Sequence, residues 1–397
     1  MSAAWQAKPI SEIAQHSLGK MLDKAKNRGT PQRYLRNLNV RWFEFSLDDV
    51  LEMPFLPEEE ERYTVRKGDL VICEGGYPGR AAIWTRDQPI YFQKALHRVR
   101  FHEPERAKWV LYYLHSCDLD GSLRQHFNGA GIQHFTGESL ARFRVTLPSL
   151  PEQSRIVAIL DKAFESIAIA RANAEKNLRN ARELFESQLV AGFHGWTTAR
   201  LGTIANHSLG KMLDKAKNKG ELKPYLRNVN VRWFNIDLSD LLEMRFLPEE
   251  AEKYTAVKGD VLVCEGGYPG RCAVWRSDEP VYFQKALHRV RFKTEEMSNW
   301  FAYFLYAQER SGKLRKYFTG TGIQHFTGEA LARLPVPVPP ARELCKLVSK
   351  FDQMSEEAER LESIYRRKLA ALDELKQSLL HPIWRSEERR VGKECRS

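Results

Sequence analysis

The twelve residues HSLGKMLDKAKN begin at His16 and begin again at His207. Three further blocks repeat with the same offset: CEGGYPGR begins at Cys73 and Cys264, YFQKALHRVRF at Tyr91 and Tyr282, and GIQHFTGE at Gly131 and Gly322. Each pair lies 191 residues apart, and residues 71–101 match residues 262–292 at 23 of 31 positions. A period of this length indicates a duplicated domain rather than a stacked array of short repeats.

Each copy begins with a segment that predicts a mixed α/β globule of about 145 residues. KGDLVIC at residues 67–73 and KGDVLVC at residues 258–264 predict a turn that leads into a buried strand. AIW and YFQKALHRVRF predict further strands. WVLYYLHS at residues 109–116 and WFAYFLYAQ at residues 300–308 predict a helix packed on these strands.

Proline then marks the end of each globule, in LPSLPEQ at residues 147–153 and LPVPVPPARE at residues 334–343. After each boundary, apolar or small residues recur at alternating spacings of four and three. The first series is Ile156, Leu160, Ala163, Ile167, Ala170, Ala174, Leu178 and Ala181, and the second is Leu347, Phe351, Met354, Ala358, Leu361, Tyr365, Leu369 and Leu372. This heptad seam predicts two long helices, which either pair with each other or lie singly on the surface.

We expect the two helices to form an antiparallel coiled coil, with the globules related by a pseudo-twofold axis. The predicted fold class is α+β, with mixed α/β globular domains that are duplicated. The predicted boundaries are globules at residues 1–150 and 196–340, helices at 151–195 and 341–384, and a tail at 385–397. The tail has no counterpart after the first helix, so we expect it to be disordered or non-native.

The composition favours a polyanionic partner, because the 397 residues carry a formal net charge of +11. A merely basic protein is the alternative. The six cysteines form no CxxC pair, which predicts no zinc site and suits a reducing cytoplasm. The chain has no apolar run of about 18 residues, and MSAAWQAKPI at the start does not resemble a signal peptide, so we expect a cytoplasmic location.

Motifs of catalytic sites are missing from the sequence, which predicts a protein that is not an enzyme and holds no cofactor or metal. There is no GxxxxGK[ST], HExxH or GxSxG. Gly129-Ala-Gly131 and Gly320-Thr-Gly322 lack the third glycine of a dinucleotide loop. A methyltransferase would need a cofactor loop and an Asn-Pro-Pro-aromatic motif. Glu74 and Glu265 follow strands but lack the second acid and the lysine of a nuclease site.

The order of motifs resembles the specificity subunit of type I restriction-modification systems. That order is a tryptophan (Trp5, Trp196), KGD with a strand, Gly-Gly-Tyr-Pro-Gly, GIQHFTG, and LPSLPEQSRIVAILD leading into a long helix. The resemblance covers the whole chain except the tail, and it is the ordered set, seen twice, that is specific. The second copy departs from the pattern, because VPPARELC at residues 338–345 replaces the PEQ signature that the first copy has at residues 151–153.

The resemblance implies a function and a set of partners. Each globule would be a target recognition domain that reads one half of a bipartite site in double-stranded DNA, and the helices would set the unread spacing. We expect two methylation subunits to dock on the helices and restriction subunits to join them. The modification would be N6-adenine methylation, with S-adenosylmethionine held by the methylation subunit and none by this chain.

The candidate DNA contacts lie in the repeated blocks. Lysines would bind phosphates, whereas arginine, glutamine and nearby polar groups would read base edges. The candidates are Lys20, Lys24, Tyr77, Arg80, Lys94, Gln133 and His134 in the first copy, and Lys211, Lys215, Tyr268, Arg271, Lys285, Gln324 and His325 in the second. Lys26 and Lys217 accompany the first lysines. The alternatives are a solvated charged face, a tight hairpin with an exposed arginine, and a structural turn.

The likeness of the two copies predicts that they read an interrupted palindrome or near-palindrome. A coiled-coil scaffold or adaptor whose globules bind protein is the alternative from another class, and DNA binding should differ from it by a steep dependence on salt. A complete restriction enzyme would be a third possibility, which the missing motifs disfavour.

Overall fold

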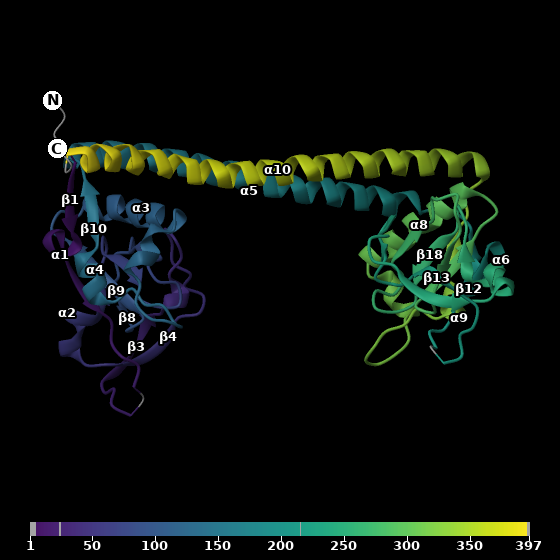
Figure 1. Cartoon of the computed structure of the whole chain (residues 1–397), viewed down its shortest axis with the longest axis horizontal. Helices are drawn as coiled ribbons and strands as arrows, with labels where there is room; N and C mark the ends of the chain where they lie inside the picture. The colour runs from purple at the N-terminus through teal and green to yellow at the C-terminus, as the bar shows by residue number, and fades with distance from the viewer. Residues whose placement is uncertain (1–4, 24, 215, 395–397) are drawn as a thin grey trace. The chain divides into compact units, whose positions relative to one another are not determined.

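The computed structural model describes residues 5–23, 25–214 and 216–394, with side chains described as far as residue 380. The chain divides into two compact units, which are described one at a time. Unit 1 comprises Met1–Ala174 and Arg367–Ser397, and unit 2 comprises Glu175–Arg366. Each unit holds one globule and a part of both long helices, α5 (Leu150–Gly192) and α10 (Ala341–Glu394) (Figure 1).

The globule of unit 1 is built mainly from short strands. Its strands are β1 (Gln6–Pro9), β2 (Ala14–Leu18), β3 (Thr30–Leu35), β4 (Leu51–Phe55), β5 (Thr64–Val65), β6 (Leu70–Cys73), β7 (Ala81–Ile83), β8 (Ile90–Phe92), β9 (Leu96–Phe101) and β10 (Arg144–Leu147). Its helices are α1 (Ile10–Ile13), α2 (Glu60–Tyr63), α3 (Arg106–Leu119) and α4 (Gly137–Arg142). Two four-stranded sheets, in the orders β2–β9–β6–β7 and β4–β3–β8–β5, accompany the pair β1–β10. The strands pair antiparallel, except that β3 and β8 are parallel.

The globule of unit 2 repeats this plan. Its strands are β11 (Thr198–Arg200), β12 (Asn206–Leu209), β13 (Glu221–Leu226), β14 (Val231–Arg232), β15 (Asn235–Ile236), β16 (Leu242–Phe246), β17 (Thr255–Ala256), β18 (Val261–Cys264), β19 (Cys272–Val274), β20 (Val281–Phe283), β21 (Leu287–Arg291) and β22 (Pro335–Pro337). Its helices are α6 (Leu201–Ile204), α7 (Ala251–Tyr254), α8 (Glu295–Arg310) and α9 (Gly328–Arg333). The sheet orders β12–β21–β18–β19 and β16–β13–β20–β17 match those of unit 1.

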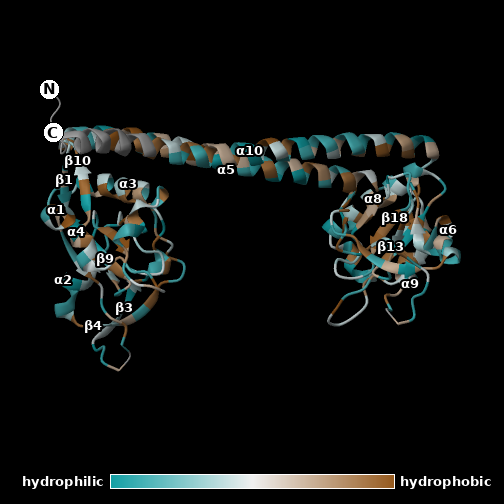
Figure 2. Ribbon diagram, viewed as in Figure 1, coloured by the Kyte–Doolittle hydropathy of each residue, from teal (hydrophilic) through white to brown (hydrophobic). Residues whose placement is uncertain are grey.

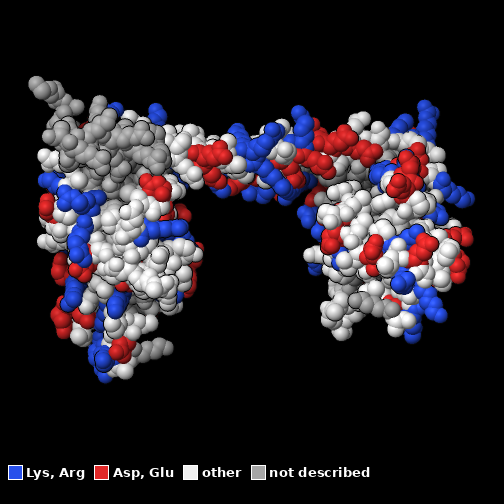
Figure 3. Space-filling model, in the orientation of Figure 1, with Lys and Arg blue, Asp and Glu red and all other residues white. Residues whose placement is uncertain are grey.

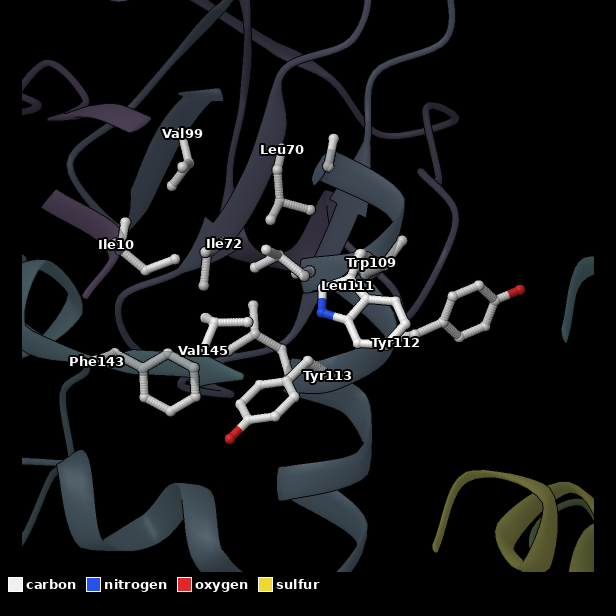
Figure 4. Packing of buried hydrophobic residues seen from close by; sticks show 14 of the residues in the cluster. Ile10, Leu70, Ile72, Val99, Trp109, Leu111, Tyr112, Tyr113, Phe143 and Val145 are labelled. Carbon is white, nitrogen blue, oxygen red and sulfur yellow. The ribbon is translucent and has the colours of Figure 1, made fainter. Parts of the chain in front are cut away.

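The position of strand β6 between two cores explains why its sequence, LVIC, is apolar without interruption. Leu70 and Ile72 pack into the larger core, with α3 (Figure 4). Val71 and Cys73 pack into a second core on the other face. Side chains alternate between the faces of a strand, so burial of both faces requires an apolar residue at every position. The strand and the helix α3 lie where the sequence predicts them.

Helix α3 joins the globule of unit 1 to α5. The indole Nε1 of Trp109 donates to the Thr146 carbonyl at 2.9 Å, and the Tyr112 hydroxyl donates to the Asp161 carboxylate at 2.9 Å. The matching bonds in unit 2 are Trp300 Nε1 to the Pro337 carbonyl at 2.7 Å and Tyr303 Oη to Asp352 Oδ1 at 2.7 Å. Asp161 and Asp352 again differ by 191, so the repeat continues into the helices.

Helices α5 and α10 pair antiparallel, as predicted. In unit 2, Arg182 of α5 binds Glu362 of α10, and further along α5 Gly192 lies against the ring of Phe351. Residue numbers thus rise along α5 and fall along α10. Apolar and polar residues alternate along both helices (Figure 2). The shared seam of apolar residues buries Leu189 and Phe351 almost completely.

The predicted tail is wrong in one respect. Helix α10 continues to Glu394, so residues 385–394 are helical rather than disordered, and residues 395–397 lie outside the described part of the chain. The stretch SEERRVGKE is rich in Glu, Arg and Lys, which favour helix. In the part of the chain that the structure describes, we find no helix of the length and apolarity that crossing a membrane requires.

Candidate nucleic-acid interface

Four segments of unit 1 meet at one edge of its globule, which we call the loop edge: residues 19–22, 74–80, 93–95 and 128–135. Backbone hydrogen bonds hold them together. Lys94 N donates to Lys20 O at 2.9 Å, Glu74 N donates to Ala95 O at 2.9 Å, and Phe135 N donates to Glu74 O at 2.7 Å. The structure therefore brings together the predicted glycine-rich, lysine-bearing and glutamine-bearing segments, which are far apart in the sequence.

Unit 2 has the same loop edge, made of residues 210–213, 265–271, 284–286 and 319–326. The three equivalent bonds are Lys285 N to Lys211 O at 2.8 Å, Glu265 N to Ala286 O at 2.9 Å, and Phe326 N to Glu265 O at 2.7 Å. They differ from those of unit 1 by no more than 0.1 Å. The backbone frame of the two edges is thus equivalent.

The glycine-rich loop of unit 1 is held in one conformation. Gly76 has a φ of 78°, and a Cβ at this position would lie 2.1 Å from Asn37 Nδ2. The same Asn37 amide donates to the Gly75 carbonyl at 3.1 Å. Both the positive φ and the close approach require glycine. The fixed loop presents the ring of Tyr77, which is 60% exposed.

Arg80 supports Tyr77. Its Nη2 donates to the Asn37 carbonyl at 2.9 Å, and its guanidinium carbon lies 4.2 Å from the centre of the Tyr77 ring. In unit 2, Arg271 bonds to the Asn228 carbonyl at 3.0 Å and lies 3.9 Å from the Tyr268 ring. The side chain predicted to read a base is thus half-buried and already bonded. This arrangement fits a residue that positions the tyrosine.

Residues 128–134 form a hairpin closed by two bonds of 2.8 Å between the backbones of Asn128 and His134. Its tip exposes the candidate residue Gln133 and also Ile132, which is 76% exposed. His134 is half-buried, with Nδ1 3.4 Å from Glu74 Oε2. In unit 2, Gln324 is likewise exposed, and His325 is half-buried like His134. The exposed amide is therefore the group of this hairpin with the best access to a ligand.

Buried His97 holds the end of that hairpin. Its Nε2 lies 2.8 Å from the Phe135 carbonyl oxygen, and His288 makes the equivalent contact with Phe326 at 2.9 Å. Burial lowers the pKa of each imidazole to about 4, so both rings are neutral at pH 7. Each neutral ring donates to the carbonyl and ties the hairpin to the central sheet.

Lys20 and Lys211 are placed otherwise than predicted. The Lys20 ammonium is buried, donates to Pro54 O at 2.9 Å, lies 2.5 Å from Glu59 Oε2, and stands 4.8 Å from the Phe55 ring centre. Lys211 makes the same contacts with Arg245 O, Glu250 and Phe246. An ammonium that is buried and paired with a carboxylate inside the globule cannot reach a phosphate. Lys20 and Lys211 therefore stabilise the globule.

The remaining predicted lysines fall into two groups. Lys94 and Lys285 are exposed at the tips of their turns, next to the backbones of residues 20 and 211. Lys24 and Lys215 lie outside the described residues. Their neighbours Lys26 and Lys217 each have a side chain 86% exposed. These exposed ammonium groups are accessible to an anionic ligand.

The sequence prediction missed Asn37 and Asn228, which fix the glycine-rich loops, and the exposed Ile132 and Ile323. A signal for the asparagines existed, because RNLNVRWF at residues 36–43 recurs as RNVNVRWF at residues 227–234. The two isoleucines stand within the repeated GIQHFTGE block but next to the glutamines that drew the prediction.

Comparison with known proteins gives consistent matches. The family model described as type I restriction modification DNA specificity domain matches residues 3–178 and again residues 194–377. The type I restriction enzyme StySPI specificity subunit of Salmonella potsdam is 20% identical, over 96% of this chain and 89% of its own. The EcoKI specificity subunit of Escherichia coli K12 is 21% identical, over 65% of this chain and 61% of its own.

Solved structures share the fold. A chain from a study of complex assembly in a type I restriction-modification system has a TM-score of 0.73 at 18% identity, covering 95% of this chain and 97% of its own. The HsdS subunit of Thermoanaerobacter tengcongensis has a TM-score of 0.61 at 19% identity, covering 97% of both chains. With a specificity domain matched in each repeat, this chain belongs to the family of type I restriction-modification specificity subunits.

Proposed function

We propose that this chain is a non-catalytic specificity subunit whose two globules each read one half of a bipartite site in double-stranded DNA. The observation that carries the proposal is the loop edge, which each unit builds with the same backbone bonds and the same exposed side chains. An edge with aromatic, amide and ammonium groups within one frame offers both base-edge contacts and phosphate contacts.

The exposed groups divide by their chemistry. Tyr77 and Gln133 have the reach and the hydrogen-bonding groups to contact base edges, and Arg80 positions the tyrosine. Lys94 and Lys26 carry exposed charges suited to phosphates. The equivalent residues of unit 2 are Tyr268, Gln324, Arg271, Lys285 and Lys217. His134, His325, Lys24 and Lys215 remain candidate DNA contacts.

The chain would direct partner subunits to the DNA. Its fold matches a chain from a type I restriction-modification assembly along 95% of its length. By that likeness, methylation subunits would dock on α5 and α10, restriction subunits would join them, and the methylation subunit would bind S-adenosylmethionine and methylate adenine at N6. The proposed location of this assembly is the cytoplasm.

The likeness of the two loop edges further predicts that the half-sites are inverted copies, or nearly so. The test is to express the chain with its methylation subunit and map modified adenines by long-read sequencing. We expect one interrupted near-palindrome at every modified locus. Two unrelated half-sites would contradict the symmetry but keep the reading function, whereas modification without any common sequence would contradict both.

Binding of the purified complex to DNA gives a second measurement. Affinity for a duplex that carries the mapped site should fall steeply between 50 and 200 mM salt, on the order of 1,000-fold if about six phosphates are contacted. A scaffold whose globules bind protein would show no selection of an oligonucleotide and a flat response to salt.

A further inference from the structure

The seam of apolar residues does not by itself choose which helices pair. Both α5 and α10 carry heptad seams with the same spacing. Such a seam stabilises an α5–α10 pair, an α5–α5 pair between two chains, or an α10–α10 pair between two chains. Selection among them requires contacts at the flank of the seam that are favourable in one pairing and unfavourable in the others.

Two ion pairs at the flank of the seam have that property. In unit 1, Arg171 of α5 binds Asp373 of α10. In unit 2, Arg182 of α5 binds Glu362 of α10 through two hydrogen bonds, one from Nε to Oε1 and one from Nη2 to Oε2 at 2.7 Å. The arginine lowers the pKa of the Glu362 carboxyl below its usual range. Basic and acidic side chains lie along both helices (Figure 3), but in these two pairs α5 supplies both cations and α10 both anions.

The repeat turns this asymmetry into selectivity. With the offset of 191, Arg171 corresponds to Glu362, and Arg182 corresponds to Asp373. If α5 paired with the α5 of a second chain in the same geometry, Arg182 of the second chain would therefore stand opposite Arg171, in the position that Asp373 has in the α5–α10 pair. Arginine then faces arginine twice. By the same construction, Glu362 faces Asp373 twice when two α10 helices pair.

A neighbouring contact adds to the selection against an α10–α10 pair. In unit 1 the Lys376 ammonium of α10 lies 5.2 Å from the ring centre of Phe164 of α5. The equivalent positions in unit 2 are Phe185 of α5 and Ser355 of α10. At both of these positions the residue of α5 is a phenylalanine. An α10–α10 pair would place Lys376 opposite Ser355 and lose the cation–π contact.

We propose that the distribution of charge on α5 and α10 specifies pairing between the two different helices and excludes pairing with the same helix of a second copy of this chain. Exchange of helices between two chains would replace four opposite-charge contacts with four like-charge contacts. The result is that α5 pairs with an α10 helix and not with the α5 of a second chain. This inference is independent of what the globules bind.

Two full-length variants separate this proposal from a general effect of charge. R182E/E362R keeps both contacts within the chain attractive, but it also makes every α5–α5 and α10–α10 contact attractive. R171D/R182E/E362R/D373R reverses both pairs, so that contacts within the chain stay attractive and contacts between identical helices stay repulsive. The second variant is the matched control, because it carries more substitutions and preserves the selectivity.

The measurement uses each full-length chain in two forms with different affinity tags. The two forms are mixed, heated and cooled together so that the helices can pair again, and captured on one tag. The fraction of the other form that is captured should rise for R182E/E362R on the order of 100-fold over the unmodified chain at low salt. The reversed variant should match the unmodified chain. For the unmodified chain, capture should increase as added salt screens the repulsion.

Equal capture of R182E/E362R and the unmodified chain would overturn the proposal, and so would equal increases in both variants. Thermal unfolding of each variant checks that the fold is retained. If R182E/E362R does not fold, R171D/D373R creates the same mixed pattern from the other ion pair and is subject to the same two outcomes.

Discussion

The loop edges of the two units are alike, whereas the sides of the two globules that face α5 and α10 share a tyrosine–aspartate bond but differ in the residues around it. In unit 1, Phe43 and Phe164 line a cavity of about 830 Å³, with Lys376 at its border. In unit 2, Phe185 stands at the position equivalent to Lys376 and packs 6.2 Å from Tyr306, ring centre to ring centre. The copies have thus kept the surface we propose to read DNA and changed the surface next to the helices.

The difference extends to a buried titratable group. His115 of unit 1 lies with its ring centre 4.9 Å from that of Phe43, and burial first, then the positive charge of Lys376, lowers its pKa to about 4. The equivalent residue of unit 2 is Tyr306, whose pKa is raised to about 12 by burial and by Glu186. Unit 1 therefore contains a group that acid can charge where unit 2 has none.

The largest expected effect is acid destabilisation, and it tests this asymmetry. His97, His288 and His115 have folded pKa values near 4 against 6.5 for free imidazole. A depressed pKa contributes stability above pH 6.5 that is lost as the pH falls toward 4, by about 3 kcal/mol per buried histidine at the lower end. Both units should weaken, and unit 1 should weaken more.

Hydrogen exchange by mass spectrometry at pH 7 and pH 5 measures the units separately. The variant His115→Tyr, which places in unit 1 the residue that unit 2 has, should reduce the acid response of unit 1 toward that of unit 2. The remaining difference is expected from His16 and His126, whose pKa values burial also lowers. An unchanged difference between the units in this variant would show that His115 is not its source.

The second effect concerns the contacts with the helices. Phe185 is almost completely buried, so Phe185→Ala should destabilise unit 2 by about 3 kcal/mol. Lys376 is half-buried over two rings, so Lys376→Ala should destabilise unit 1 by about 1 kcal/mol or less. Chemical denaturation of each variant, monitored by hydrogen exchange in each unit, measures both losses of stability. Equal losses would mean that the two interfaces are energetically equivalent despite their different residues.

The third effect tests the likeness of the loop edges. Tyr77→Ala with Gln133→Ala should weaken binding to one half-site on the order of 10-fold, and Tyr268→Ala with Gln324→Ala should weaken the other by the same factor. Duplexes mutated in one half-site at a time assign each pair to its half. Lys26→Ala is the control, since loss of a phosphate contact should reduce binding to all sequences and lower the salt slope by about one. If only one of these two double variants lost affinity for DNA, the two loop edges would not be equivalent.

The smallest effect concerns one ion pair. Arg182→Glu places two acids together and should lower the stability of unit 2 by about 1 kcal/mol at low salt, because the arginine side chain is 46% exposed. R182E/E362R should restore it. Thermal melting at low and high salt measures both, and failure of the second substitution to recover the loss would show that the contact itself adds nothing.

The repeat, the central strand β6, the helix α3 and the antiparallel helices could be predicted because each depends on a local pattern read twice. The environment of the candidate residues could not. Lys20 is buried by Pro54 and by Glu59, which lies 39 residues away. Arg80 is bonded to the Asn37 carbonyl, 43 residues away. Neither contact leaves a periodicity in the sequence, because both depend on how the two sheets come together.

The backbone of Glu74 joins three segments of the loop edge, accepting from Phe135 and donating to Ala95. None of these bonds uses a side chain of Tyr77, Lys94 or Gln133. Replacing those three residues therefore leaves the frame intact, in the same way as substitutions in the variable loops of an antibody leave its framework intact. A globule built in this way can acquire a new recognition sequence through a few substitutions without losing its fold.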